Sequence, residues 1–168
     1  MKKPSLIVAA VLAALATSAA VAATATSTFQ VLITVTKACS VTAGTASNID
    51  FGSVASTATA LSASSNISVT CSKSTPYNIG MLPSNNNTTG AGVMSPVVAG
   101  PDTIAYQLRS VSATGPIWGN TATPTAVGNG VAGTGTGAAQ SIPVWATVAS
   151  VNVTPGAYLD TVTVQVNY

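Results

Sequence analysis

The chain has 168 residues, of which only 5% are charged, and it contains no histidine. A typical soluble domain carries about 25% charged residues, so this composition excludes a nucleic-acid-binding protein, which needs a basic face. The three acidic residues are all aspartates, which argues against an enzyme that depends on histidine or on paired carboxylates. The length fits one domain, and 47% hydrophobic residues suffice for a core.

The N-terminus has the organisation of a secretory signal peptide, predicted to span residues 1–23. Two lysines precede an unbroken apolar run from Leu6 to Ala16, and small residues follow that run. Cleavage is expected after Ala22 or Ala23. A short membrane anchor is the alternative, but a bilayer-spanning helix needs about 20 apolar residues, and this run is shorter. The pattern therefore predicts an exported protein.

Removal of this leader leaves a chain without formal net charge. The value of +2 for the full sequence comes from the two leader lysines. Without them, three cationic side chains balance three aspartates. A protein near zero net charge has little electrostatic protection against association. We therefore expect association to be part of what the exported chain does.

The rest of the chain alternates apolar and polar residues with the period of β-strands. Valine and threonine are abundant, and charged helix formers are nearly absent, so no helix could present a charged face to water. The predicted inward faces are, in chain order, Phe29–Val35, Cys39 with Val41, Ile67–Cys71, Tyr77–Met81, Ile104–Leu108, Ile142–Val148 and Tyr158–Tyr168, the last interrupted at Asp160.

Two stretches are predicted as loops from their composition. They are SNNNTTGAG at Ser84–Gly92 and GNGVAGTGTG at Gly128–Gly137. About seven short strands joined by such turns predict an all-β fold of two packed sheets, of the immunoglobulin-like sandwich type.

Cys39 and Cys71 are predicted to form a disulfide. An even number of cysteines in an exported protein is typical of a disulfide framework, and Cys71 shares the inward phase of Ile67 and Val69. Two free thiols or a metal site are the alternatives. Structural zinc needs about four cysteine, histidine or carboxylate ligands, so two cysteines without any histidine argue against a metal.

The first apolar stripe is the most regular in the chain and follows the leader almost directly. Its alternating members are Phe29, Val31, Ile33 and Val35. An apolar strand at a free terminus is an aggregation hazard unless it pairs with something. The pattern leaves two possibilities, namely the first strand of its own sandwich or a strand that completes another molecule.

Other motifs do not predict a cofactor. The glycine-rich run at 133–137 is followed by a strand pattern, whereas a dinucleotide fingerprint needs a helix there. The three aspartates are too far apart in sequence to predict a calcium site. Trp118 and Trp145 could form a sugar-binding platform, but their place in or beside strand patterns favours packing.

Ordered blocks over nearly the whole exported chain resemble the spore coat protein U domain family, which includes subunits of Csu-type (archaic) chaperone–usher pili. The departures lie at Ser84–Pro101 and Thr121–Val131. The blocks are TFQVLITVTKACSV at 28–41, IDFGSV at 49–54, ISVTCSKSTPYNIGM at 67–81, IAYQLRS at 104–110, IWGN at 117–120, GTGTGAAQSIPVWATV at 133–148 and PGAYLDTVTVQVNY at 155–168.

The resemblance implies an incomplete immunoglobulin-like sandwich that lacks its last strand and is completed by a donor strand from the next subunit. Residues 24–37 would be the donor-strand extension, and 38–168 the pilin domain. The donor side chains would be Phe29, Val31, Ile33 and Val35. The groove- and chaperone-facing side chains of the C-terminal strand would be Val162, Val164, Val166 and Tyr168.

The implied function is that of a pilus (fimbrium) subunit at the surface of a Gram-negative bacterium, in adhesion and biofilm formation. The implied partners are identical or related subunits, a periplasmic chaperone and an outer-membrane usher. No nucleic acid, small-molecule substrate, metal or cofactor is expected. The alternative is a secreted surface- or carbohydrate-binding module of the same fold, and an enzyme is disfavoured because no nucleophile motif or histidine base is present.

Overall fold

The computed structural model describes residues 22–168, so most of the predicted signal peptide lies outside the described residues. The chain divides into two units, one up to Thr34 and one over Val35–Tyr168. No helix or strand is formed over 22–38. Within the described part of the chain, no helix is both long and apolar enough to span a membrane.

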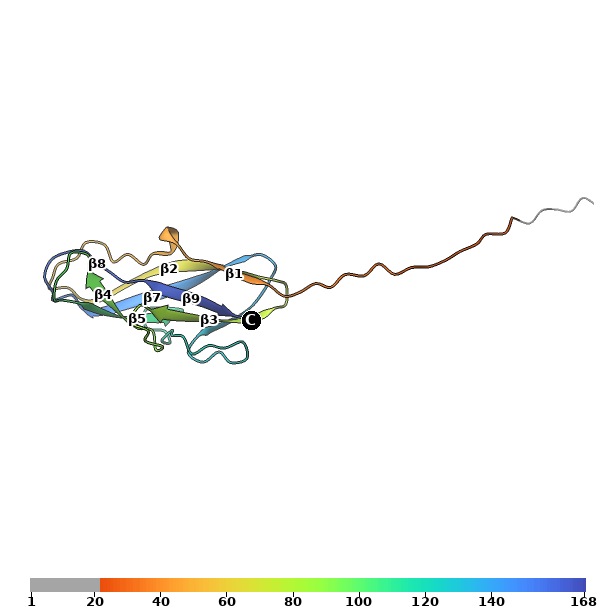
Figure 1. Cartoon of the computed structure of the whole chain (residues 1–168). Coiled ribbons are helices and arrows are strands. Elements are labelled where there is room, and N and C mark those ends of the chain that lie inside the picture. The colour runs from red at the N-terminus through yellow and green to blue at the C-terminus, as the bar shows by residue number, and fades with distance from the viewer. Residues whose placement is uncertain (1–21) are drawn as a thin grey trace, which may run out of the picture. The chain divides into compact units, whose positions relative to one another are not determined.

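Residues 35–168 form two antiparallel sheets, which confirms the all-β prediction (Figure 1). The one short helical turn described is η1 (Thr45–Ser47). The larger sheet has the strand order β1 (Cys39–Thr42), β2 (Thr59–Cys71), β7 (Ala139–Ser150), β5 (Ile104–Ser110), β4 (Ala91–Pro96) and β8 (Tyr158–Leu159). The smaller sheet has the order β6 (Val131–Thr134), β3 (Pro76–Pro83) and β9 (Val162–Asn167).

The core lies between the inward faces of the two sheets, as the period-2 pattern requires. The predicted faces of β2, β3, β5 and β7 are buried there, except that Ile142 in β7 is only half-buried. Trp118 is fully buried among them, and its indole Nε1 donates a hydrogen bond to the Ile79 carbonyl at 2.9 Å. This confirms that Trp118 is a packing residue, because a buried ring cannot serve as a sugar platform.

Both predicted loops were partly wrong, because β4 begins at Ala91 and β6 lies wholly within 128–137. Each strand contains a glycine opposite a tyrosine, Gly92 against Tyr106 and Gly133 against Tyr77. A Cβ at Gly92 would lie 2.0 Å from the Tyr106 Cζ, and one at Gly133 would lie 2.3 Å from the Tyr77 Cζ. These glycines therefore make room for rings that cover them and do not break the strand.

The C-terminal stripe, expected as one strand, is divided between the two sheets. β8 pairs with β4 of the larger sheet, and β9 pairs with β3 of the smaller sheet. The crossing occurs at Asp160 and Thr161, where the stripe is interrupted in the sequence. An alternating pattern specifies which side chains point inward, but it does not specify which neighbour a strand pairs with.

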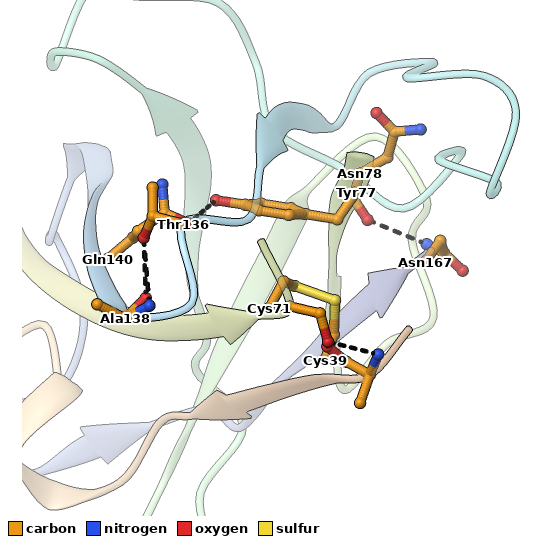
Figure 2. Close-up of a disulfide and its surroundings, with 10 residues drawn as sticks. Cys39, Cys71, Tyr77, Asn78, Thr136, Ala138, Gln140 and Asn167 are labelled. Atoms are coloured by element: carbon orange, nitrogen blue, oxygen red, sulfur yellow. Dashed lines mark hydrogen bonds between the residues drawn. A yellow bond between two sulfur atoms is a disulfide. The ribbon is translucent and has the colours of Figure 1, made fainter. Parts of the chain in front are cut away.

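The predicted disulfide between Cys39 and Cys71 is present and joins β1 to β2 (Figure 2). The Ser72 amide donates to the Ala38 carbonyl at 2.9 Å, so the adjacent cysteines occupy a non-hydrogen-bonded pair of the ladder. Directly opposed residues approach most closely at such a pair, and the two Cα atoms are 4.1 Å apart. The bond therefore fixes the edge strand β1 covalently to its neighbour β2.

Removal of this disulfide should destabilise the domain. The double variant Cys39→Ala with Cys71→Ala is expected to lower the free energy of unfolding by about 3–4 kcal/mol, the loop-entropy value for cysteines 32 residues apart. Urea denaturation of both proteins under oxidising conditions measures the difference. A loss below about 1 kcal/mol would contradict the chain-entropy account of this bond.

Candidate binding groove

An apolar groove of about 880 Å³ opens beside β9. Its lining includes most of the segment 43–51, which contains η1, and residues 158–162 and 164. The floor consists of inward side chains from both sheets, namely Ile67, Met81, Met94, Tyr106, Leu108, Val144 and Ala146. The groove therefore reaches directly into the core of the sandwich.

β9, which contributes to the groove, and β1, which precedes the lining segment 43–51 in the chain, are both edge strands. β1 pairs only with β2, and β9 pairs only with β3, within the described part of the chain. Each strand consequently presents a row of backbone groups without a strand partner on its outer side. The molecule thus offers an open apolar groove together with unpaired strand edges.

The core is incompletely covered along β9. Val164 and Val166 remain only half-buried, whereas their partners across the ladder on β3, Met81 and Ile79, are fully buried. Half-exposed valines on an inward face leave apolar area in contact with water. An additional strand laid against β9 would cover this area.

Of the four residues predicted to face the groove, two line it and two lie beyond it. Val162 and Val164 line the groove, while Val166 packs partly against the core. Tyr168 is 39% exposed, and its ring centroid lies 5.8 Å from the Lys37 Nζ, within the range of a cation–π contact. Val166 and Tyr168 therefore continue the line of β9 beyond the part that lines the groove.

Two carboxylates lie in the groove, and sequence reasoning did not place them there. Asp160 Oδ2 accepts a hydrogen bond from the Tyr106 hydroxyl at 2.7 Å, and its Oδ1 accepts one from the Thr161 amide at 2.8 Å. Asp50 Oδ1 accepts a hydrogen bond from the Gly52 amide at 2.7 Å. No lysine or arginine is among the residues that line the groove, so its charge is negative. The interruption of the last apolar stripe at Asp160 was the available signal.

The Tyr106 hydroxyl remains a hydrogen-bond donor over the whole physiological pH range. Burial of the ring raises the pKa of Tyr106 far above its usual value, and the hydrogen bond to Asp160 and the negative charge of that carboxylate raise it further. The tyrosine therefore stays neutral and holds the Asp160 carboxylate at the groove.

The N-terminal stripe is extended and exposed. Phe29, Val31, Ile33 and Val35 each expose more than 80% of their surface, and so does Leu32, which points to the other side of the alternation. Contiguous apolar exposure of this kind marks an interaction site. Sequence reasoning identified the alternating members but did not single out Leu32.

The model of the Spore Coat Protein U domain matches residues 25–165 of the chain. The chain belongs to the Spore Coat Protein U domain family. This confirms the resemblance inferred from the ordered sequence blocks, and it places the stripe, the disulfide and the groove within one family domain. A comparison with curated proteins found no match.

Two solved structures resemble this Spore Coat Protein U domain protein. One is the CsuC–CsuE chaperone–tip adhesion subunit pre-assembly complex from archaic Csu pili of Acinetobacter baumannii, with 23% identity and a TM-score of 0.48 over 80% of this chain. The other is a chaperone–tip adhesin complex of CFA/I fimbriae, with 11% identity and a TM-score of 0.45 over 71% of this chain. The matches span 40% and 38% of those chains, respectively.

Replacement of Tyr106 by phenylalanine should change how stability depends on pH. The raised pKa of Tyr106 contributes stability that is fully present below about pH 10, where the unfolded side chain ionises, and is lost as the pH rises above that value. Tyr106→Phe is expected to lower the free energy of unfolding by about 1–2 kcal/mol at pH 7 through the lost hydrogen bond.

The same variant should lose less stability than the wild type between pH 9 and about pH 11. Urea denaturation at both pH values measures this difference. If the free energy of unfolding changes with pH in the same way for both proteins, the pKa of Tyr106 is not raised in the folded state.

Proposed function

We propose that this chain is a structural subunit of a chaperone–usher pilus that polymerises by donor-strand complementation. The observation that carries the proposal is the presence, in one chain, of an exposed apolar stripe and an open apolar groove. The stripe offers four alternating large side chains at Phe29–Val35. The groove is lined in part by β9, an edge strand with one free side. Each feature supplies what the other lacks.

In this proposal the stripe of one copy is laid against β9 of the next copy as an added strand. The backbone of the inserted segment pairs with the exposed strand edge, and alternate side chains enter the groove, as in other cases of β-augmentation. The donor site and the acceptor site are different surfaces, so the contact is heterologous and does not close on itself. Repetition of the contact produces a filament.

Apolar burial would supply a large favourable contribution to such a filament. Burial of four large apolar side chains contributes roughly 6–12 kcal/mol, at about 1.5–3 kcal/mol each, before the cost of ordering the segment. The backbone hydrogen bonds of the added strand act in the same direction. A polymer held in this way should resist detergent and dissociate on heating.

The same exposure explains why the subunit would need partners before assembly. A signal peptide directs export, and an apolar groove beside an unpaired edge would aggregate in the periplasm unless it were covered. We infer that a periplasmic chaperone covers the groove and that an outer-membrane usher receives the subunit. The resulting pilus would lie on the surface of a Gram-negative bacterium and serve adhesion and biofilm formation, with no catalytic role for the subunit.

Gel electrophoresis of the purified exported chain tests the proposal. We expect ladders of multimers that survive SDS at room temperature and collapse to monomer on boiling. A protein that remains monomeric at every concentration, with or without its chaperone, would favour the alternative of a secreted binding module.

Replacement of Ile33 by aspartate should abolish the ladder. Ile33 lies in the middle of the stripe, so its replacement would be buried in the groove of the neighbour as an unpaired charge, at a cost of several kcal/mol. We expect at least a hundredfold loss of multimers, with the amount of soluble subunit on its chaperone unchanged. Thr34→Asp is the control, because residue 34 points to the opposite side of the strand. Equal assembly of the two variants would exclude a donor role for the stripe.

Deletion of residues 24–35 should remove the donor function of the subunit and leave its acceptor function intact. The shortened subunit keeps the groove and should still bind the chaperone and accept a donor strand, but it cannot donate one. Mixed with the wild type, it is expected to occur once per fibre, at one end. Incorporation at internal positions, detected by an epitope tag along isolated fibres, would contradict the donor assignment.

A further inference from the structure

We propose that Lys37 of one copy pairs with Asp160 in the groove of the next copy, and that this ion pair sets the direction and the register of the inserted strand. The inference rests on the proposed function, because it requires the stripe of a second copy as the occupant of the groove. It goes further in naming a polar contact that distinguishes one mode of insertion from the others.

The groove is an apolar site with an unbalanced negative charge. Asp50 and Asp160 are its two charged lining residues, and both receive hydrogen bonds from neutral donors only. Asp160 is half-buried immediately before β9, and the Tyr106 hydroxyl holds it in place. A half-buried carboxylate without a cation among the groove residues favours an occupant that brings one.

The donor segment brings one cation, at a position that suits this carboxylate. The cationic side chains over residues 22–168 are Lys37, Lys73 and Arg109. Arg109 lies in β5, where its Nη1 donates to the Gly115 carbonyl at 2.7 Å. Lys73 follows β2, two residues after Cys71 in the sequence, and is not among the groove residues. Of these three, Lys37 alone adjoins the stripe. It lies two residues beyond Val35, in the same alternating phase as Phe29, Val31, Ile33 and Val35.

An antiparallel register with Lys37 opposite Asp160 matches every inward position of the two segments. Directly opposed residues of an antiparallel pair lie on the same face of the sheet. The seven residues of the stripe then meet the seven residues at the end of the chain. The opposed pairs are Val35 with Val162, Ile33 with Val164, Val31 with Val166 and Phe29 with Tyr168.

The alternative modes of insertion lose the ion pair. A parallel insertion that matches the same apolar positions places Ser27 opposite Asp160 and Lys37 far from that carboxylate. An antiparallel shift by two residues places either Lys37 opposite Val162 or Val35 opposite Asp160. Each shifted antiparallel register buries a charge against an apolar side chain, which is unfavourable, and the parallel insertion leaves Asp160 opposite a serine without a cation. The apolar stripe alone would not discriminate among them.

Kinetics of multimer formation by the full exported chain test the ion pair. We expect Lys37→Glu to slow assembly about tenfold and Lys37→Gln about threefold, as for loss or reversal of a partly exposed pair. Lys73→Glu is the matched control, because it changes the net charge equally at a site outside the groove, and it should stay within about twofold of the wild type.

The acceptor side of the pair is tested with Asp160→Asn, which keeps an oxygen that accepts the Tyr106 hydrogen bond but removes the charge. In chains that carry this substitution, the Lys37→Glu penalty should shrink to less than about threefold, because the repulsion is gone. An unchanged penalty, or an equal effect of Lys73→Glu, would overturn the proposal. Thermal unfolding of the monomers establishes that each variant is folded.

Cross-linking reads the register directly. A copy with Val35→Cys mixed with a copy with Val162→Cys should give a heat-stable mixed disulfide in the multimer, whereas Val35→Cys with Val166→Cys should not, because these positions lie about 14 Å apart. A disulfide from Val35→Cys to Tyr168→Cys would show parallel insertion and overturn the proposal. Wild-type chains that form no ladder at all would instead overturn the proposed function.

Discussion

The structure depends on one constraint, which is that a β-strand needs a neighbour on each side and cover on its inward face. β9 meets this constraint on one side only, through its ladder with β3. Its inward valines stay half-buried, and β1 of the larger sheet is also an edge strand. The open apolar groove and the half-buried valines beside it both follow from the edge position of β9, which has no strand partner on its outer side among the described residues.

The sequence predicted the inward faces well because burial alternates with the pleat. The stripes in β2, β3, β5 and β7 lie in the core apart from the half-buried Ile142, and Cys71, whose inward phase indicated the disulfide, is buried with them. Glycine misled the prediction in β4 and β6, because the residue that permits a turn also permits a tyrosine ring to lie flat on a strand. Only the tertiary contact distinguishes the two uses.

The candidate site was less accessible to sequence reasoning. The groove combines residues from segment 43–51, from both sheets and from the crossing at Asp160, and their proximity depends on strand order, which alternation does not encode. The role of Asp160 was hidden for the same reason, since its partner Tyr106 lies 54 residues away in the sequence. The terminal stripe, by contrast, was identifiable because its alternating apolar members lie within seven consecutive residues, so no knowledge of strand order was needed.

The position of the disulfide has a mechanical consequence for a filament built in the proposed way. Tension between subunits would enter each domain at Ala38, directly before Cys39, and β1 is only four residues long. A ladder of that length would peel apart under a modest pull. The Cys39–Cys71 disulfide would transmit the force to β2, whose 13 residues are paired along most of their length with β7. The subunit would thus resist stretching with the centre of its larger sheet instead of with its weakest edge.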